Sequence, residues 1–357
     1  MVYLVSLAMI VAFVGYTPPK NGLQQNNYKN YMILCGFLIA ALSGLRSRYT
    51  GYMGDTYTYT LLYEGLQDYE SFREYYDIHM EGYDFLSSEA GFYYFMWLLG
   101  RVFKDGQMAL ISSSIVITWG ACRFIYRNST DAPLSLTIYV CLTMFTFNMH
   151  GMRQAMAMSI CLFAYEFAKN RRIIPFVLTV LLAMLFHKTA MCFFPVWFLP
   201  RLKNSIGNWL FYVLGLIVCL LFVDKIIAGY FELSGEDYSG TEAATGGGLF
   251  VVLLYLGGIV LTLYKPNLLG NPATRVAFLG TLVGLVAYLA RYTGSAILER
   301  ISYYYYYFLI LLIPEAIQKL EGNEHKIIKL CFIAGALALF AYRAWNGSFR
   351  YFTLFFL

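Results

Sequence analysis

Hydrophobic residues gather in long blocks along this chain, and short polar stretches separate one block from the next. Blocks of this kind are typical of membrane-crossing α-helices, whereas a membrane barrel would show short strands of alternating polarity. We therefore predict an all-α, polytopic integral membrane protein of roughly 11–13 membrane helices, with residues 1–357 forming one membrane-embedded domain. The expected helices cover residues 2–16, 31–45, 92–103, 108–126, 134–149, 152–168, 173–186, 190–199, 209–230, 249–264, 276–290, 301–317 and 327–345.

Several of these blocks are shorter than the ~20 residues that a membrane span needs. The two blocks on either side of His187 form one broken helix or a re-entrant hairpin, and either form requires that the break packs in protein or lines a cavity. The first block has no basic segment before it and no small-residue cleavage site. It is expected to be a membrane helix and not a cleaved signal peptide.

Composition supports the membrane assignment. Hydrophobic residues make up 59% of the chain, charged residues 13%, and the mean hydropathy is +0.57. A soluble protein of this size carries about twice that charged fraction. The net charge of +5 fits membrane orientation better than nucleic-acid binding. All seven cysteines lie in apolar blocks without a C-x-x-C pair, so they are expected to be core residues.

Charge also predicts the orientation of the helices. Lysine and arginine recur at 169–172, 201–203, 265–275 and 319–329, which are the expected cytoplasmic ends. The stretch 46–88 is expected to be an external loop, because nine acidic residues and one basic residue lie between positions 55 and 89. A second external loop is expected at 231–248. Counting spans then places Arg123 and Arg127 outside, so one segment between 92 and 149 is expected not to cross.

Five arginines lie at expected external helix ends or within apolar surroundings: Arg46, Arg48, Arg153, Arg291 and Arg300. Arginine binds phosphate through two parallel hydrogen bonds, so several arginines from separate helices would suit a diphosphate or another anionic head group. The alternative is that each arginine simply extends toward the lipid head groups.

Three further residues are candidates for proton transfer or charge pairing. His187 follows an apolar block directly and is a candidate general base. Asp55 lies in a glycine-rich turn and Glu89 begins an apolar block, and a helix cap or a loop charge is the alternative for both. No two histidines have the spacing of metal ligands, so we expect neither a metal site nor a cofactor.

The run of five tyrosines at 303–307 covers every face of a helical turn. Packing at the membrane interface is the favoured interpretation, because tyrosine is enriched there. A platform for stacking sugars is the alternative, since aromatic rings pack against the apolar faces of sugar rings.

Five short motifs, taken in order, resemble the EpsG/Wzy-type family of bacterial polysaccharide polymerases, which make O-antigen, capsule and exopolysaccharide. The resemblance covers most of the chain. The motifs are Gly44-Leu45-Arg46 with Gly54-Asp55-Thr56 and Tyr59, then Glu89-Ala90-Gly91-Phe92, Met152-Arg153-Gln154-Ala155-Met156-Ala157, Phe186-His187-Lys188-Thr189-Ala190 and Glu299-Arg300-Ile301.

The resemblance implies a substrate and a reaction. The substrate would be an oligosaccharide repeat unit on undecaprenyl diphosphate, presented in the membrane lipid at the outer face of the bacterial plasma (inner) membrane. The growing glycan would move from its carrier onto a new lipid-linked unit. The resemblance also implies a GT-C-like, metal-independent glycosyltransferase without a cofactor, and partners such as a flippase and a chain-length regulator.

Chemistry and resemblance together predict the site. His187, Asp55 and Glu89 are the expected catalytic residues, because the acceptor hydroxyl must lose a proton and the sugar develops positive charge. Cations must stabilise the leaving diphosphate; Arg153, Arg291 and Arg300 are expected to do so. The residues expected to position substrate are Arg46, Arg48, Tyr59, Gln154 and Tyr303.

Two other functions remain open at this point. A glycan ligase would use nearly the same residues on a different acceptor. A flippase or transporter of the lipid-linked glycan is the non-enzymatic alternative, although such proteins often have pseudo-symmetric halves and this sequence shows no internal repeat.

Overall fold

The structure is a computed structural model that describes residues 24–48, 56–80, 88–141, 144–222, 225, 229, 248–264, 266–291 and 296–345. All regular secondary structure in these residues is helical, and none of them belongs to a strand. By length and composition, three helices can cross a membrane: Gln107–Asn128, Pro272–Ala290 and Gly322–Tyr342. The bent pair Ala132–Cys141 and Met144–His150 makes a fourth if it is one span. The chain is an all-α polytopic membrane protein, as its hydrophobic blocks predicted.

The expected total of 11–13 membrane helices stays a prediction. The first expected helix, Asp55 and nearly all of the expected loop at 231–248 lie outside the described residues. The described helices are α2 (Gln24–Gly44), α3 (Thr56–Gly65), η1 (Leu66–Asp68), α4 (Phe72–His79), α5 (Ala90–Gly100), α6 (Gln107–Asn128), α7 (Ala132–Cys141), α8 (Met144–His150), α9 (Met152–Lys169), α10 (Ile173–Met184), η2 (Lys188–Trp197), η3 (Leu199–Arg201), α11 (Ile206–Leu221), α13 (Gly248–Tyr264), η4 (Pro266–Gly270), α14 (Pro272–Ala290), α15 (Ala296–Gln318) and α16 (Gly322–Trp345).

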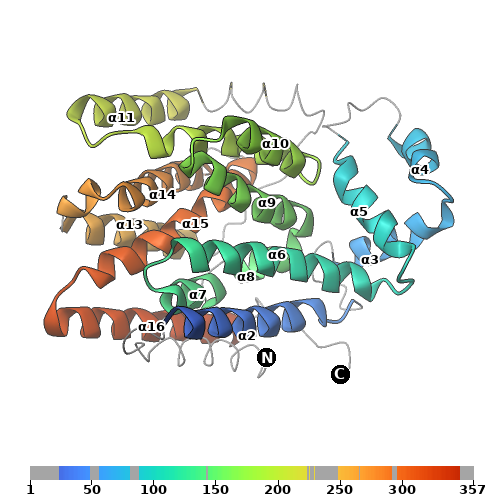
Figure 1. Cartoon of the computed structure of the whole chain (residues 1–357), viewed down its shortest axis with the longest axis horizontal. Helices are drawn as coiled ribbons and strands as arrows, with labels where there is room; N and C mark the ends of the chain where they lie inside the picture. Colours follow the sequence, from blue (N-terminus) through green and yellow to red (C-terminus); the bar gives the residue numbers. More distant parts are fainter. Residues whose placement is uncertain are drawn as a thin grey trace.

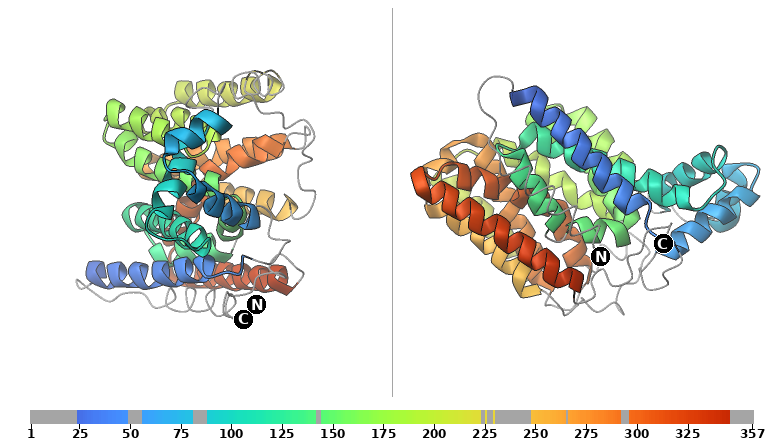
Figure 2. Two further views of the ribbon diagram at one scale, coloured as in Figure 1. Left: turned by 90° about the vertical axis from the view of Figure 1, so that its right-hand side faces the viewer. Right: turned by 90° about the horizontal axis from the view of Figure 1, so that it is seen from below.

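The long helices form a layered bundle, and α3, α4 and α5 project from one side of it (Figure 1). Helices α2 and α16 lie along one face of the bundle, as Figure 2 shows. The projecting lobe differs from the sequence expectation, because the stretch 46–88 is helical over much of its described part and is not a plain loop. Ser71 caps α4 by accepting a hydrogen bond from the Glu74 N–H at 3.2 Å. Buried Tyr63 and Leu66 belong to a second, smaller core, in which α3, η1 and α5 pack against α6 and the start of α9.

Helices α6 and α9 run parallel, which decides where Arg123 and Arg127 lie. The C-terminal ends of the two helices meet, because Lys169 donates a hydrogen bond to Asn128 at 2.6 Å. Arg123 and Arg127 therefore lie at the same end of the bundle as Lys169 and the basic residues that follow it. Helix α5 has 11 residues and spans about 16 Å, short of the ~30 Å apolar core of a bilayer. Helices α7, with 10 residues, and α8, with 7, are also shorter than a span, so the expectation that one segment between 92 and 149 does not cross stays a prediction.

Helix α15 lies in the centre of the bundle and carries the five tyrosines. All five are buried against other helices, so their side chains do not form an interfacial belt as the sequence suggested. Pro314 lacks an N–H and leaves the Ile310 carbonyl without its helical partner. The Ser135 hydroxyl donates to that carbonyl at 2.9 Å. Helix α7 thereby supplies the hydrogen bond that Pro314 cannot make, and it stabilises α15 at a position where proline favours a kink.

The chain reverses at His187. Phe176, near the start of α10, packs against Trp197, at the end of η2, with 5.3 Å between ring centroids. The two segments are therefore antiparallel, which selects the hairpin over the single broken helix. His187 is in extended conformation at the hairpin tip and precedes the first residue of η2. The hairpin thus starts and ends near the basic end of the bundle, and its tip at His187 lies inside the protein.

Candidate active site

The hairpin tip docks onto the N-terminus of α5 through reciprocal backbone contacts. The Lys188 N–H donates to the Glu89 carboxylate at 3.1 Å, and the Phe92 N–H donates to the Leu185 carbonyl at 3.2 Å. Glycine is needed at position 91, because a Cβ atom there would lie 2.7 Å from the Leu185 Cβ and 3.0 Å from its carbonyl oxygen. Two of the sequence motifs are thus two sides of one contact.

Glu89 is the charged centre of this contact. Its side chain is buried, its Oε2 accepts from Arg153 Nη1 at 2.6 Å, and its Oε1 contacts His187 Nδ1. Burial alone would raise the pKa of Glu89, but His187, Arg153 and the Lys188 N–H outweigh it and lower the pKa from 4.5 to about 2. The carboxylate therefore stays ionised across the physiological range and is a weak base.

The pair with Glu89 determines the hydrogen position on His187. An ionised carboxylate only accepts hydrogen bonds, so Nδ1 carries a hydrogen. Nε2 has no hydrogen-bond partner among the described residues, and the ring lines a cavity. Nε2 is therefore the ring nitrogen left to a bound molecule, and in a neutral imidazole it is the nitrogen that can accept a proton.

This cavity, called the His187 cavity below, has a volume of about 160 Å³. It lies where α3, the α8–α9 junction, the hairpin tip and the start of α15 meet. Arg153 is about one-third exposed and places one guanidinium edge on Glu89 and Tyr59, with Nε 3.4 Å from the Tyr59 hydroxyl. The lining residues are Tyr59, Phe147, His150, Gly151, Arg153, Gln154, His187 and Arg300. Two arginines and two histidines therefore line one small, partly polar space.

Gln154 joins two walls of the His187 cavity. Its Nε2 donates to the Arg300 carbonyl at 2.6 Å, which ties the first turn of α9 to the first turns of α15. Because the bond goes to backbone, it sets the position of the Arg300 side chain without occupying its guanidinium. Arg153 and Arg300 are thus held on facing helices.

Arg291 and Tyr303 lie beside the cavity but do not line it. Arg291 is buried, donates to Glu299 at 2.9 Å and to the Tyr288 hydroxyl at 2.7 Å, and lies over the Tyr288 ring. The Tyr303 hydroxyl donates to the same Glu299 oxygen at 2.9 Å. Phe147 connects this network to the cavity, since its ring packs on Tyr303 at 4.1 Å between centroids. Tyr303 therefore packs on a lining residue from outside the cavity, and Arg291 is connected to Tyr303 through Glu299.

A sequence model of the EpsG family matches residues 29–356 of the chain. The chain belongs to the EpsG family. Membership makes it a membrane protein of polysaccharide biosynthesis with a polymerase-type, glycosyltransferase-like function. No curated protein and no solved structure shows a significant match to the chain.

Arg46 of this EpsG-family protein is buried and does not line the His187 cavity. It donates to the Met149 carbonyl at 2.9 Å and to the Ser43 carbonyl, and burial lowers its pKa to about 10. Gln107 donates to the Arg46 carbonyl at 2.9 Å. The side chain thus holds the α8–α9 junction, from which His150 and Arg153 reach the cavity.

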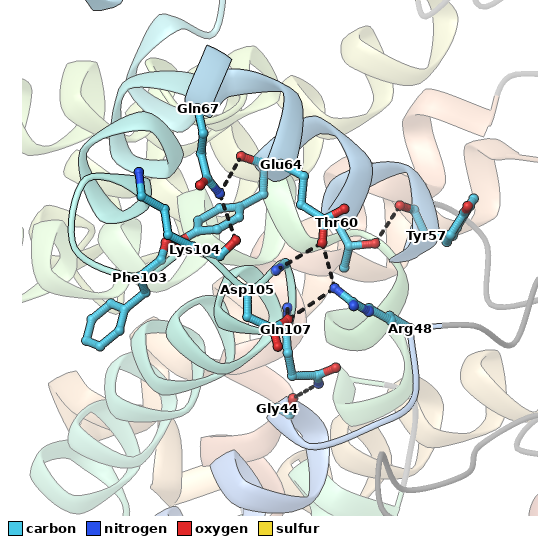
Figure 3. A network of polar contacts seen from close by, with 12 residues as sticks. Gly44, Arg48, Tyr57, Thr60, Glu64, Gln67, Phe103, Lys104, Asp105 and Gln107 are labelled. Carbon is cyan, nitrogen blue, oxygen red and sulfur yellow. Dashed lines mark hydrogen bonds and ion pairs between the residues drawn. The ribbon is translucent and has the colours of Figure 1, made fainter. Parts of the chain in front are cut away.

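Arg48 connects the lobe to the bundle, as Figure 3 shows. Its Nη1 lies 2.7 Å from Glu64 on α3 and 3.1 Å from Asp105 in the α5–α6 connection. The Gly106 N–H also donates to Glu64, at 3.2 Å. Arg48 does not line the His187 cavity, so Arg46 and Arg48 both make contacts between elements outside that cavity.

The sequence motifs did not single out three residues that line the cavity, namely Phe147, His150 and Gly151. His150 and Gly151 fall between the expected helices at 134–149 and 152–168, and that gap in the hydrophobic pattern was the available signal. In the structure Gly151 lies between α8 and α9. No cluster of three or more His, Cys, Asp or Glu side chains suitable for a metal ion occurs in the described part of this EpsG-family chain.

Proposed function

We propose that the protein polymerises undecaprenyl-diphosphate-linked oligosaccharide repeat units, transferring the growing glycan onto a new lipid-linked unit. One observation carries the proposal: His187, Arg153 and Arg300, from three separate elements, converge on one cavity. A base and two cations are what transfer from a diphosphate requires. The parallel ends of α6 and α9 put the basic residues at the opposite end, which supports an outward-facing cavity by the positive-inside rule.

In this mechanism His187 is the general base. Its Nε2 takes the proton of the acceptor hydroxyl as that oxygen bonds to the anomeric carbon of the donor sugar. The bond from the anomeric carbon to the diphosphate breaks, and its electron pair leaves with the lipid diphosphate. Glu89 positions the imidazole and stabilises its charged form, as carboxylates do beside catalytic histidines.

Arg153 and Arg300 bind the diphosphate and stabilise the charge that develops on it, without a metal ion. Tyr59 and Gln154 position these cations through the contacts described above. Arg291 acts indirectly, because it neutralises Glu299 next to Arg300. Asp55 lies outside the described residues and stays a candidate catalytic residue.

The test uses purified protein in lipid with synthetic lipid-linked repeat units. A ladder of longer lipid-linked products supports polymerisation. Transfer to an unrelated acceptor alone would favour a ligase, and translocation without new glycosidic bonds would favour a flippase; either result excludes the proposed reaction.

Site variants sharpen the same assay. We expect Arg153→Ala, Arg300→Ala and His187→Ala each to lower the ladder rate by about 10²-fold or more, since one positioned acid–base or charge-stabilising group contributes that much. Arg73→Ala is the matched control, because Arg73 is 89% exposed on the lobe. Unfolding temperatures close to wild type show that the variants fold. Wild-type rates in folded Arg153→Ala and Arg300→Ala would rule out the diphosphate site.

A further inference from the structure

A second cavity lies at the basic end of the bundle, among α6, α9, α14 and α15. Its volume is about 480 Å³, and its polar lining residues include Arg127, Asn128, Lys169, Thr274 and Glu315. Helix α9 runs from the His187 cavity to Lys169, about 25 Å at 1.5 Å per residue. This space, called the Glu315 cavity, is therefore separate from the candidate active site and has no part in the mechanism above.

Glu315 is a buried carboxylate with little compensation. Only 7% of the residue is exposed, and the Thr274 hydroxyl donates to its Oε1 at 3.0 Å. Within the described ranges, no lysine, arginine or histidine nitrogen lies within 4.0 Å of it. A carboxylate in a membrane protein interior is costly unless it is paired, and such residues commonly mark binding sites. One hydroxyl donor leaves most of its acceptor capacity facing the cavity.

The cations of the Glu315 cavity lie nearer its mouth and pair elsewhere. Arg127 and Lys169 have side chains that are 52% and 38% exposed, and both lie 3.8–3.9 Å from Glu166. These are long, exposed ion pairs, which hold their partners weakly. The lining also includes Tyr165, Val276, Ala277 and Leu311, whose side chains are largely apolar. The buried carboxylate of Glu315, with the more exposed cations Arg127 and Lys169 on the same cavity, fits a zwitterion whose cationic group lies deeper than its anionic group.

We propose that the Glu315 cavity binds a phosphoethanolamine group, with the primary ammonium on Glu315 and the phosphate between Arg127 and Lys169. An ammonium supplies three N–H donors to the carboxylate, whereas a trimethylated choline supplies none. The group comes from a membrane phospholipid or from a water-soluble phosphoethanolamine compound, which share this chemistry. The apolar walls at the end of a membrane bundle favour the phospholipid.

The test is binding to purified full-length protein in detergent, followed by native mass spectrometry and by unfolding temperature. The probes are phosphatidylethanolamine, phosphatidylcholine, phosphatidylglycerol and soluble glycerophosphoethanolamine. We expect phosphatidylethanolamine to bind about 10-fold more tightly than phosphatidylcholine, as a charge-assisted hydrogen bond contributes. Tight binding of the soluble compound would identify the soluble source, and its failure beside tight lipid binding would identify the lipid.

Two variants separate the halves of the site. Glu315→Gln should abolish the preference for ethanolamine over choline, while Glu321→Gln, the same change at an exposed position six residues on, should keep it. Arg127→Gln should weaken phosphatidylethanolamine and phosphatidylglycerol alike and leave the ethanolamine preference intact. Equal binding of ethanolamine and choline lipids to wild type overturns the proposal. So does an unchanged preference in Glu315→Gln or, if that variant does not fold, unchanged affinities in Arg127→Gln.

Discussion

Glu89 has a left-handed backbone conformation, with φ of 52°, directly before α5. A non-glycine residue pays a small energetic cost for this conformation, and such residues persist where surrounding contacts hold them. Here the contacts are the His187 ring, the Arg153 guanidinium and the Lys188 N–H. Because these three donors keep the Glu89 carboxylate ionised and weakly basic, Glu89 is suited to orienting its neighbours. In our proposal the general base is therefore His187 and not Glu89.

The charge on Glu89 predicts how stability depends on pH. Because the pKa falls from 4.5 to about 2 in the folded protein, the stabilisation is fully present above pH 4.5 and is lost as the pH falls toward 2. Glu89→Gln should therefore lower the unfolding temperature at pH 7, by the equivalent of ~3 kcal/mol for a broken buried pair. The difference from wild type should shrink between pH 4.5 and 2.

Thermal unfolding in detergent across this pH range measures the effect. Glu70→Gln, an exposed carboxylate on the same lobe, is the control and should match wild type at each pH. A wild-type advantage over Glu89→Gln that stays constant down to pH 2 would contradict the depressed pKa.

At the scale of elements, the hairpin of α10 and η2 brings the base to the site. Its arms are apolar and short, and their tip needs a partner for its backbone groups because no lipid can supply hydrogen bonds. The N-terminus of α5 supplies that partner, through Glu89 and the Phe92 N–H. The lobe therefore has a structural role, because the N-terminus of α5 holds the hairpin tip beside the His187 cavity.

Gly91→Ala tests this docking. The added Cβ would meet the Leu185 backbone at 3.0 Å and cannot be relieved by a side-chain rotation. We expect a loss of about 1–3 kcal/mol in stability, typical of overpacking, together with a lower ladder rate. Hydrogen exchange of the Phe92 and Lys188 N–H groups should speed up, because their acceptors move away.

Gly335→Ala is the matched control, since a Cβ at that helical position has no neighbour within 4 Å. Alanine should be neutral or slightly stabilising there. If Gly91→Ala and Gly335→Ala had the same stability, hydrogen exchange and activity, the close contact between α5 and the hairpin would not be needed for function.

At the scale of the whole molecule, charge divides the bundle into two ends. Arg123, Arg127 and Lys169 lie together because α6 and α9 are parallel, and the start of α16 adds Lys329, which pairs with Asp131. The His187 cavity lies at the other end, beside the acidic lobe. By the positive-inside rule we expect the basic end to face the cytoplasm.

Cysteine labelling tests this orientation. In a Cys331→Ser background, which removes an exposed native cysteine, a membrane-impermeant maleimide should label Glu70→Cys on intact spheroplasts. Lys203→Cys, an exposed position at the basic end, should react only after the membrane is opened. The reverse pattern would place the cavity in the cytoplasm and exclude the proposed outward-facing reaction.

The amino-acid sequence by itself determined the helical, membrane-embedded class and most of the bundle. The expected helices at 108–126 and 152–168 agree with α6 and α9 to within two residues at each end. The signal is local, because each block must present apolar side chains along its own length. The lobe was not recognised, since α3 and α4 are short and are stabilised by packing on α5 and α6.

Tertiary structure decided which candidate residues meet. Tyr59, Arg153, Gln154, His187 and Arg300 line one cavity, and Glu89 pairs with two of them. Arg46, Arg48 and Arg291 are arginines in similar sequence settings, yet they hold carbonyls and carboxylates behind or beside that cavity. Sequence records the presence of a charge at a helix end. Whether that charge faces substrate or a protein partner depends on contacts between segments far apart in the chain, which only the folded structure sets.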